Sequence, residues 1–157
     1  MKALDAAGLA RELDALQPRQ CDCAVIVATD EDIVRKAVEG AARRGIDVVT
    51  LVSDLPGSAR RHFVGIDNIA AGRTAASLIG RFCHKGKVGL VAGWLGLRDH
   101  RERLEGFTRL LESEFPGIEI VGPVEGRDDN DETRRQVETM LAEHQDLAGL
   151  YNLGAGN

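Results

Sequence analysis

The sequence predicts an α/β protein with parallel sheets and flanking helices. Short apolar runs rich in valine and isoleucine recur along the chain, and amphipathic segments of helical period separate them. Glycine or proline stands at many of the junctions. Strands that alternate with helices favour right-handed crossovers and parallel pairing, so the sheets are expected to be mostly parallel.

The strands are predicted from the apolar runs. Runs of this kind are typical of strands that helices cover on both faces of a parallel sheet. Cys23 in the first run is predicted to be buried, as free cysteine usually is. The predicted strands are 21–29, 46–54, 62–67, 87–93, 118–124 and 147–153.

The helices are predicted from leucine spacing and from capping residues. Thr29, Asp30, Asp128 and Asp129 are residue types expected at helix starts, and Asp30 is placed as the cap of the second helix. Asp99 is predicted to cap the fourth helix, with Glu102 three residues later as in a capping box. The predicted helices are one that ends before Pro18, 30–44, 68–83, one from 99 to Pro116, and one that opens at 128–132.

Composition and charge exclude several classes of function. The net charge is −5 and basic residues alternate with acidic ones, which argues against a nucleic-acid-binding domain or a polybasic membrane patch. No apolar run approaches membrane-spanning length, and the first residues do not resemble a secretory signal. Three cysteines, an odd number, fit a reducing compartment, so a cytoplasmic location is predicted.

Signatures of catalysis are scarce. The four histidines show no metal-ligand spacing, so no metal and no cofactor are expected, and the chain is predicted not to be an enzyme. Gly154-Ala155-Gly156 resembles the start of a dinucleotide fingerprint, which leaves a Rossmann-type NAD-dependent enzyme as an alternative. The chain opens on a helix without a preceding strand and closes on a strand with no helix after it, which predicts a fragment that is incomplete at both ends.

Ligands of open parallel sheets bind beyond the carboxyl ends of the strands. Asp54 precedes Leu-Pro-Gly, so a simple turn explains it as well as a ligand contact does. His100 is expected to be a solvated residue of the first helical turn. The candidate ligand-binding residues are Arg103, Asp67, Asp54, Ser53, Asp99 and Arg98.

Arg103 is the most unusual of these candidates. Leu104, Phe107, Leu110 and Leu111 define the buried stripe of the fourth helix, and Arg103 projects within about 50° of its centre. Arg98 and Arg101 are expected at the surface or at the rim of a cleft. A buried guanidinium needs an oxygen-rich partner, and Asp67 is the predicted one. The bridge either only organises the core or also faces a polar ligand; the second interpretation is favoured.

Several blocks together resemble the LacI-type transcriptional regulators and the related periplasmic sugar-binding proteins. I-D-N-x-x-A-G-R at 66–73 and R-x-E-G-F at 103–107 are the most specific of them. The order VVTLVSDLPGS, KVGLVAGW and LAGLYNLGAGN also matches these families. The similarity covers nearly the whole chain and is clearest from Val48 onward.

The resemblance implies a two-lobed sensor that binds a sugar or polyol in the cleft between its lobes. Residues 1–65 would belong to the amino lobe, 66–67 to the crossing and 68–157 to the carboxyl lobe. Arg103 matches the ligand-contacting arginine of the family, and Asp67 matches the aspartate at the crossing. The acid at Asp54 comes slightly later than in many relatives, and Gly154-Ala155 replaces the Asn-Asp that many of them carry.

The resemblance also implies partners. The leading hypothesis is the effector-binding domain of a LacI-type regulator that forms a homodimer and signals to a DNA-binding helix-turn-helix outside this chain. The alternative is the periplasmic sugar-binding protein of a transporter.

Overall fold

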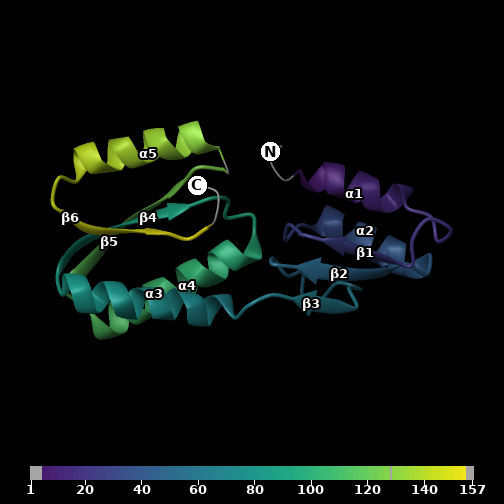
Figure 1. The fold of residues 1–157 in the computed structure, drawn as a ribbon, viewed down its shortest axis with the longest axis horizontal. Helices are drawn as coiled ribbons and strands as arrows, with labels where there is room; N and C mark the ends of the chain where they lie inside the picture. The colour runs from purple at the N-terminus through teal and green to yellow at the C-terminus, as the bar shows by residue number, and fades with distance from the viewer. Residues whose placement is uncertain (1–4, 128, 155–157) are drawn as a thin grey trace. The chain divides into compact units, whose positions relative to one another are not determined.

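The computed structural model describes residues 5–127 and 129–154, which form two units. Unit 1 holds the chain through Ile66 together with Gly96–Asp99, and unit 2 holds Asp67–Leu95 and the chain from His100 onward. Figure 1 labels the elements of both units. Among the described residues, no helix combines the length and the apolar character that crossing a membrane requires.

Unit 1 contains one parallel sheet with two helices on the same side of it (Figure 1). Its strands, β1 (Cys23–Ile26), β2 (Asp47–Leu51) and β3 (His62–Val64), pair in the order β1-β2-β3. Helices α1 (Ala6–Ala15) and α2 (Asp32–Arg43) pack against each other and against buried strand residues such as Ile26 and Val48.

The other face of this sheet corrects the prediction of a first strand buried on both sides. Cys23 is exposed, and Val25, two residues along β1, is 63% exposed. Val64 on β3 is exposed as well. Residues two apart on a strand share a face, so Cys23 and Val25 mark one exposed face of the sheet. The apolar run does form a strand, but among the described residues no second layer covers this face.

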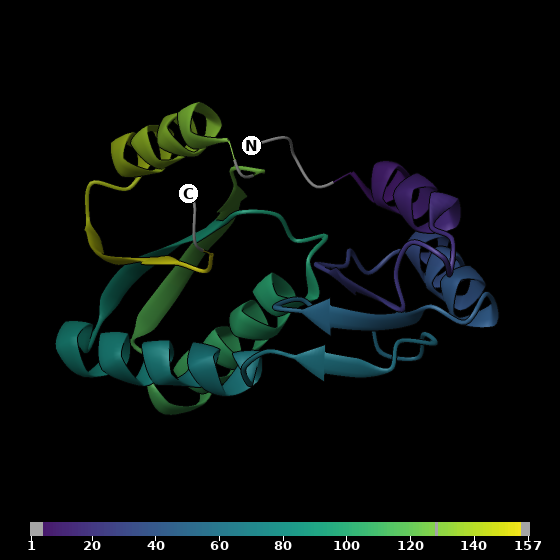
Figure 2. The same cartoon turned by 45° about the vertical axis from the view of Figure 1, so that its right-hand side comes forward.

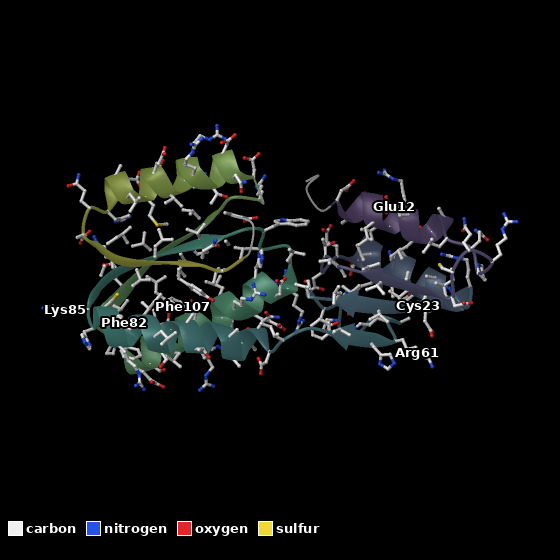
Figure 3. The ribbon with its side chains drawn as sticks, in the orientation of Figure 1. Glu12, Cys23, Arg61, Phe82, Lys85 and Phe107 are labelled. Carbon is white, nitrogen blue, oxygen red and sulfur yellow. The ribbon has the colours of Figure 1, made fainter. Side chains whose placement is uncertain are left out.

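Unit 2 is a three-layer arrangement, with helices on both sides of a parallel sheet (Figure 2). Strands β4 (Gly86–Ala92), β5 (Ile118–Glu125) and β6 (Leu147–Asn152) pair in the order β5-β4-β6. Helices α3 (Asn68–Cys83) and α4 (Arg98–Glu114) lie on one side, and α5 (Asn130–Glu143) lies on the other. Phe107 of α4 points into the core between its helix and the sheet (Figure 3).

The predicted fold class, helices and strands are confirmed, with shifts at the ends. Asp129 caps α5 as predicted, because its Oδ1 accepts hydrogen bonds from the backbone of Asp131 and Glu132 at 2.9 Å each. Asp30 does not cap α2: that helix starts at Asp32, and the residue before it makes no side-chain cap bond. Asp128 lies outside the described residues.

Candidate ligand-binding site

The carboxyl ends of the strands in unit 2 bring polar groups from distant parts of the chain together. The loop after β4, the end of β6 and the start of α3 meet near the first turns of α4. Backbone bonds join these strand ends: Leu153 N donates to Val91 O at 2.8 Å, and Gly126 N donates to Ala92 O at 2.9 Å. This is the edge of a parallel sheet at which ligands are expected.

Arg103 lies at this edge and is half-buried, as the helical wheel predicted. Its Nε donates to Oδ1 of Asn68 at 2.9 Å, and its Nη1 donates to the carbonyl oxygen of Leu153 at 2.6 Å. A guanidinium is a planar fork of N–H donors, so two fixed acceptors set its plane. Its role in ligand binding stays a prediction.

Asp67 does not pair with Arg103 as the sequence suggested, and its role in ligand binding stays a prediction. It is exposed and occupies the N-cap of α3, where its Oδ1 accepts a hydrogen bond from Ala70 N at 2.9 Å. The predicted Asp67–Arg103 bridge is therefore wrong, and the neighbouring Asn68 supplies the oxygen instead. A cap side chain turns back toward its own helix, which points it away from α4.

Two glycines explain how α3 and α4 approach closely enough for this contact. A Cβ on Gly72 would lie 2.1 Å from the backbone oxygen of Arg103, and a Cβ on Gly106 would lie 2.1 Å from the backbone oxygen of Ile69. Real Cβ atoms do not come this close to backbone, so only glycine fits at either position. The glycines of the two most specific sequence blocks are thus packing residues.

The first turn of α4 holds the loop that precedes it. His100 is 5% exposed, and its Nδ1 lies 3.1 Å from the backbone nitrogen and 3.0 Å from the backbone oxygen of Trp94. Arg101 donates to the carbonyl oxygen of Leu95 at 2.8 Å. The prediction that His100 is solvated is wrong, and Arg101 is half-buried rather than simply solvated.

Tyr151 of β6 borders the same region. Its ring stacks on that of Phe107, with centroids 4.6 Å apart and the planes 24° apart. Burial raises the pKa of Tyr151 above its ordinary value, and the positive charge of Arg103 partly opposes that rise.

Two of the candidates in unit 1 are brought together at the start of α4. Arg98 is the first residue of that helix, and its backbone N–H donates to Oγ of the fully buried Ser53 at 3.1 Å. Asp99 is buried in the first helical turn. The prediction that it is the N-cap and that Arg98 precedes the helix is therefore wrong, because the helix begins two residues earlier than a cap at Asp99 implies. Ser53 thus satisfies one of the open N–H groups of a helix start.

Asp54 is held by its own loop. Its Oδ1 accepts from Thr50 Oγ1 at 2.9 Å and from Leu55 N at 2.7 Å, and both carboxylate oxygens accept from Arg60, at 2.5 and 2.8 Å. Burial alone would raise the pKa of Asp54, but the hydrogen bonds from Arg60, Thr50 and Leu55 and the charge of Arg60 lower it below its ordinary value. This geometry favours the turn interpretation over a ligand contact.

Asp30 is also engaged in unit 1. Its carboxylate pairs with Arg35, whose guanidinium also donates to the carbonyl oxygen of Pro56. Asp30 therefore links α2 to the loop after β2 rather than capping the helix. Across the described residues, no cluster of His, Cys, Asp and Glu has the geometry to hold a metal ion. Ala155 and Gly156 lie outside these residues.

Sequence reasoning missed Asn68, the Leu153 carbonyl and the two helix-packing glycines. Asn68 could have been found, because it lies four and eight residues before Gly72 and Ala76, on a helix face whose small residues allow close packing. A backbone carbonyl such as that of Leu153 leaves no signal in the sequence.

Comparisons with known proteins agree with this architecture. A family model for a periplasmic binding protein domain matches residues 3–157. The ribose import binding protein RbsB of Bacillus subtilis is 26% identical over 141 residues, which are 89% of this chain and 45% of that protein.

Solved structures show the same similarity. An ABC transporter solute binding protein from Burkholderia graminis, in complex with D-arabinose, is 29% identical with a TM-score of 0.91, over 97% of this chain and 53% of that one. A solute binding protein from Agrobacterium vitis with bound D-fucose is 26% identical with a TM-score of 0.86, over 92% and 51%.

The chain spans about half the length of these relatives. They are transport proteins, which matches the predicted alternative better than the predicted LacI-type regulator. The family model covers all but the first two residues, and the fold of parallel sheets with flanking helices agrees with it. The chain belongs to the periplasmic binding protein domain family.

Proposed function

We propose that this chain is the sugar-binding part of a solute-binding protein that serves a sugar importer. The observation that carries the proposal is the oriented guanidinium of Arg103 at the carboxyl edge of the unit 2 sheet. Relatives with this architecture are named for ribose or were solved with D-arabinose and D-fucose. Sugars present neighbouring hydroxyl oxygens, and a guanidinium can donate two parallel N–H groups to such a pair.

Binding alone, without chemistry, is the proposed activity. The relatives are named as binding proteins, and the candidate residues form a hydrogen-bonding surface rather than a nucleophile with its base. In this proposal Arg103 selects ligands that carry adjacent oxygens. Asp54 and Ser53 keep the folding roles that their contacts give them.

Isothermal titration calorimetry of the chain with D-arabinose, D-fucose and D-ribose tests the proposal. We expect saturable binding of at least one sugar and loss of that binding in Arg103→Ala, with Arg109→Ala as the control on the exposed face of α4. NAD serves as the competing ligand. Binding of NAD with no response to any sugar would favour the Rossmann-type enzyme and overturn the proposal.

The regulator hypothesis makes different predictions about the gene. A helix-turn-helix encoded with this domain would support a LacI-type sensor, its homodimer, its DNA contact and its cytoplasmic location. An export signal would support the importer. The relatives named above favour the importer.

A further inference from the structure

The side chain of Asn68 is buried at the meeting point of α3 and α4. It is 2% exposed, and its Oδ1 accepts the Nε–H of Arg103 at 2.9 Å. We propose that Asn68 is the positioning residue that aims Arg103 at the ligand. This inference rests on the proposed function, because it assigns to Asn68 the orientation of the sugar-contacting guanidinium.

The chemistry of the contact suits this role. Asn68 and the Leu153 carbonyl are both neutral acceptors, so these two bonds fix the guanidinium plane without cancelling its charge. A carboxylate at position 68 would pair with the guanidinium and compete with the ligand for it. An amide therefore orients Arg103 without placing a negative charge of its own beside the guanidinium.

The backbone around Asn68 makes the contact rigid. Asn68, Gly72, Ala76 and Gly80 are the buried residues of α3, spaced four apart on one face, and Asn68 is the polar member of that face. Gly72 lies one turn after Asn68, and its missing Cβ lets the backbone of Arg103 pack against α3. Close packing between the helices thus places the amide within hydrogen-bonding reach of Nε.

The competing interpretation is that Asn68 only stabilises the fold. Loss of a buried polar contact lowers stability in either case. The two interpretations differ in what happens to Arg103 when the protein remains folded. A purely structural Asn68 would leave the Arg103 side chain and its ligand contact unchanged, whereas a positioning residue would not.

The test uses NMR of the Arg103 Nε–H group, assigned by its loss in Arg103→Lys, together with sugar titration on the same samples. Asn68→Ala removes the acceptor, and Asn68→Leu removes it while keeping the volume. Asn68→Asp retains an oxygen acceptor. Thr74→Ala is the matched control, because Thr74 also lies on α3 but its hydroxyl donates only to Ala70 O, on an exposed face.

We expect Asn68→Ala or Asn68→Leu to speed solvent exchange of the Arg103 Nε–H by at least about tenfold and to weaken sugar binding by about tenfold, since a hydrogen bond to a charged group is lost. Asn68→Asp should keep the Nε–H protected, and Thr74→Ala should change neither readout. Unchanged Nε–H exchange in a folded Asn68→Ala or Asn68→Leu would overturn the inference. If the wild-type chain binds no sugar, the proposed function fails, and so does the proposal that Asn68 aims Arg103 at a sugar. The Nε–H exchange would then report only on the hydrogen bond between Asn68 and Arg103.

Discussion

Arg103 in α4 donates a hydrogen bond to the carbonyl oxygen of Leu153, 50 residues later in the chain, across 2.6 Å. The candidate ligand contact is therefore also a tie between α4 and the end of β6. Substitutions of Arg103 are expected to act on folding and on binding together. A loss of sugar binding in such a variant therefore has to be compared with its free energy of unfolding.

Removing the Arg103 side chain should destabilise unit 2. Arg103→Ala deletes the bonds to Asn68 and Leu153, and we expect the free energy of unfolding to fall by about 2 kcal/mol. Urea denaturation measures this change. Arg109→Ala is the control: its exposed pair with Glu105, one turn away on α4, should be worth no more than about 0.5 kcal/mol. Equal losses in the two variants would contradict the assigned contacts.

The ionisation of Tyr151 should report the position of Arg103. Tyr151 is the single tyrosine of the chain, so the tyrosinate absorbance follows this residue alone. Its pKa is raised by burial, and the charge of Arg103 limits that rise. Arg103→Met removes the charge, so the pKa of Tyr151 should rise further. Because the folded form holds this proton more tightly, stability should also decline as pH rises above about 10. A lower pKa of Tyr151 in Arg103→Met would contradict this electrostatic influence of Arg103.

A methyl group at Gly72 should force α3 and α4 apart. Gly72→Ala places a Cβ against the backbone of Arg103, and we expect a loss of about 2–3 kcal/mol in the free energy of unfolding. Gly40→Ala in α2 is the matched control, because the new Cβ would meet only the ends of flexible side chains. That variant should be neutral or more stable by up to about 1 kcal/mol. A stable Gly72→Ala would show that the helices do not need this approach.

Asp54 should make unit 1 sensitive to acid. Its pKa in the folded protein is lowered, mainly by the hydrogen bonds and charge of Arg60 acting against burial. The stabilisation is therefore complete above the ordinary carboxyl pKa of about 3.9 and is lost as pH falls through the lower folded value. In Asp54→Asn the free energy of unfolding should change less than in the wild type between pH 5 and pH 2. These two pH values lie about one unit above and about two units below that ordinary pKa. Glu12→Gln, at an exposed position of α1, is the control and should keep the wild-type dependence of stability on pH. The same dependence in Asp54→Asn would count against the hydrogen bonds between Asp54 and Arg60.

Much of the fold was predictable because its signals are local. Apolar runs and capping residues place β2, α3 and β4 within a few residues of their observed bounds. Cys23 could not be placed, because its burial depends on whether a second layer covers the sheet, and no local pattern encodes that. His100 was misjudged for a similar reason: the loop through Trp94 folds back over it.

The site was predictable in part. Helical spacing predicted correctly that Arg103 faces inward. Its partner was assigned to Asp67, whereas the observed partner is the next residue, Asn68. Asp67 serves as the cap and Asn68 begins the helix, so the amide rather than the carboxylate reaches α4. Ser53 was chosen for its place after a strand, and the structure gives it a cap role at Arg98.

Calorimetric titration of the wild-type chain and of Arg103→Ala with D-arabinose measures whether the Arg103 guanidinium binds sugar. We expect saturable binding by the wild-type chain and at least about a tenfold loss of affinity in a folded Arg103→Ala, because charge-assisted hydrogen bonds to the sugar disappear. Wild-type affinity retained in folded Arg103→Ala would contradict it.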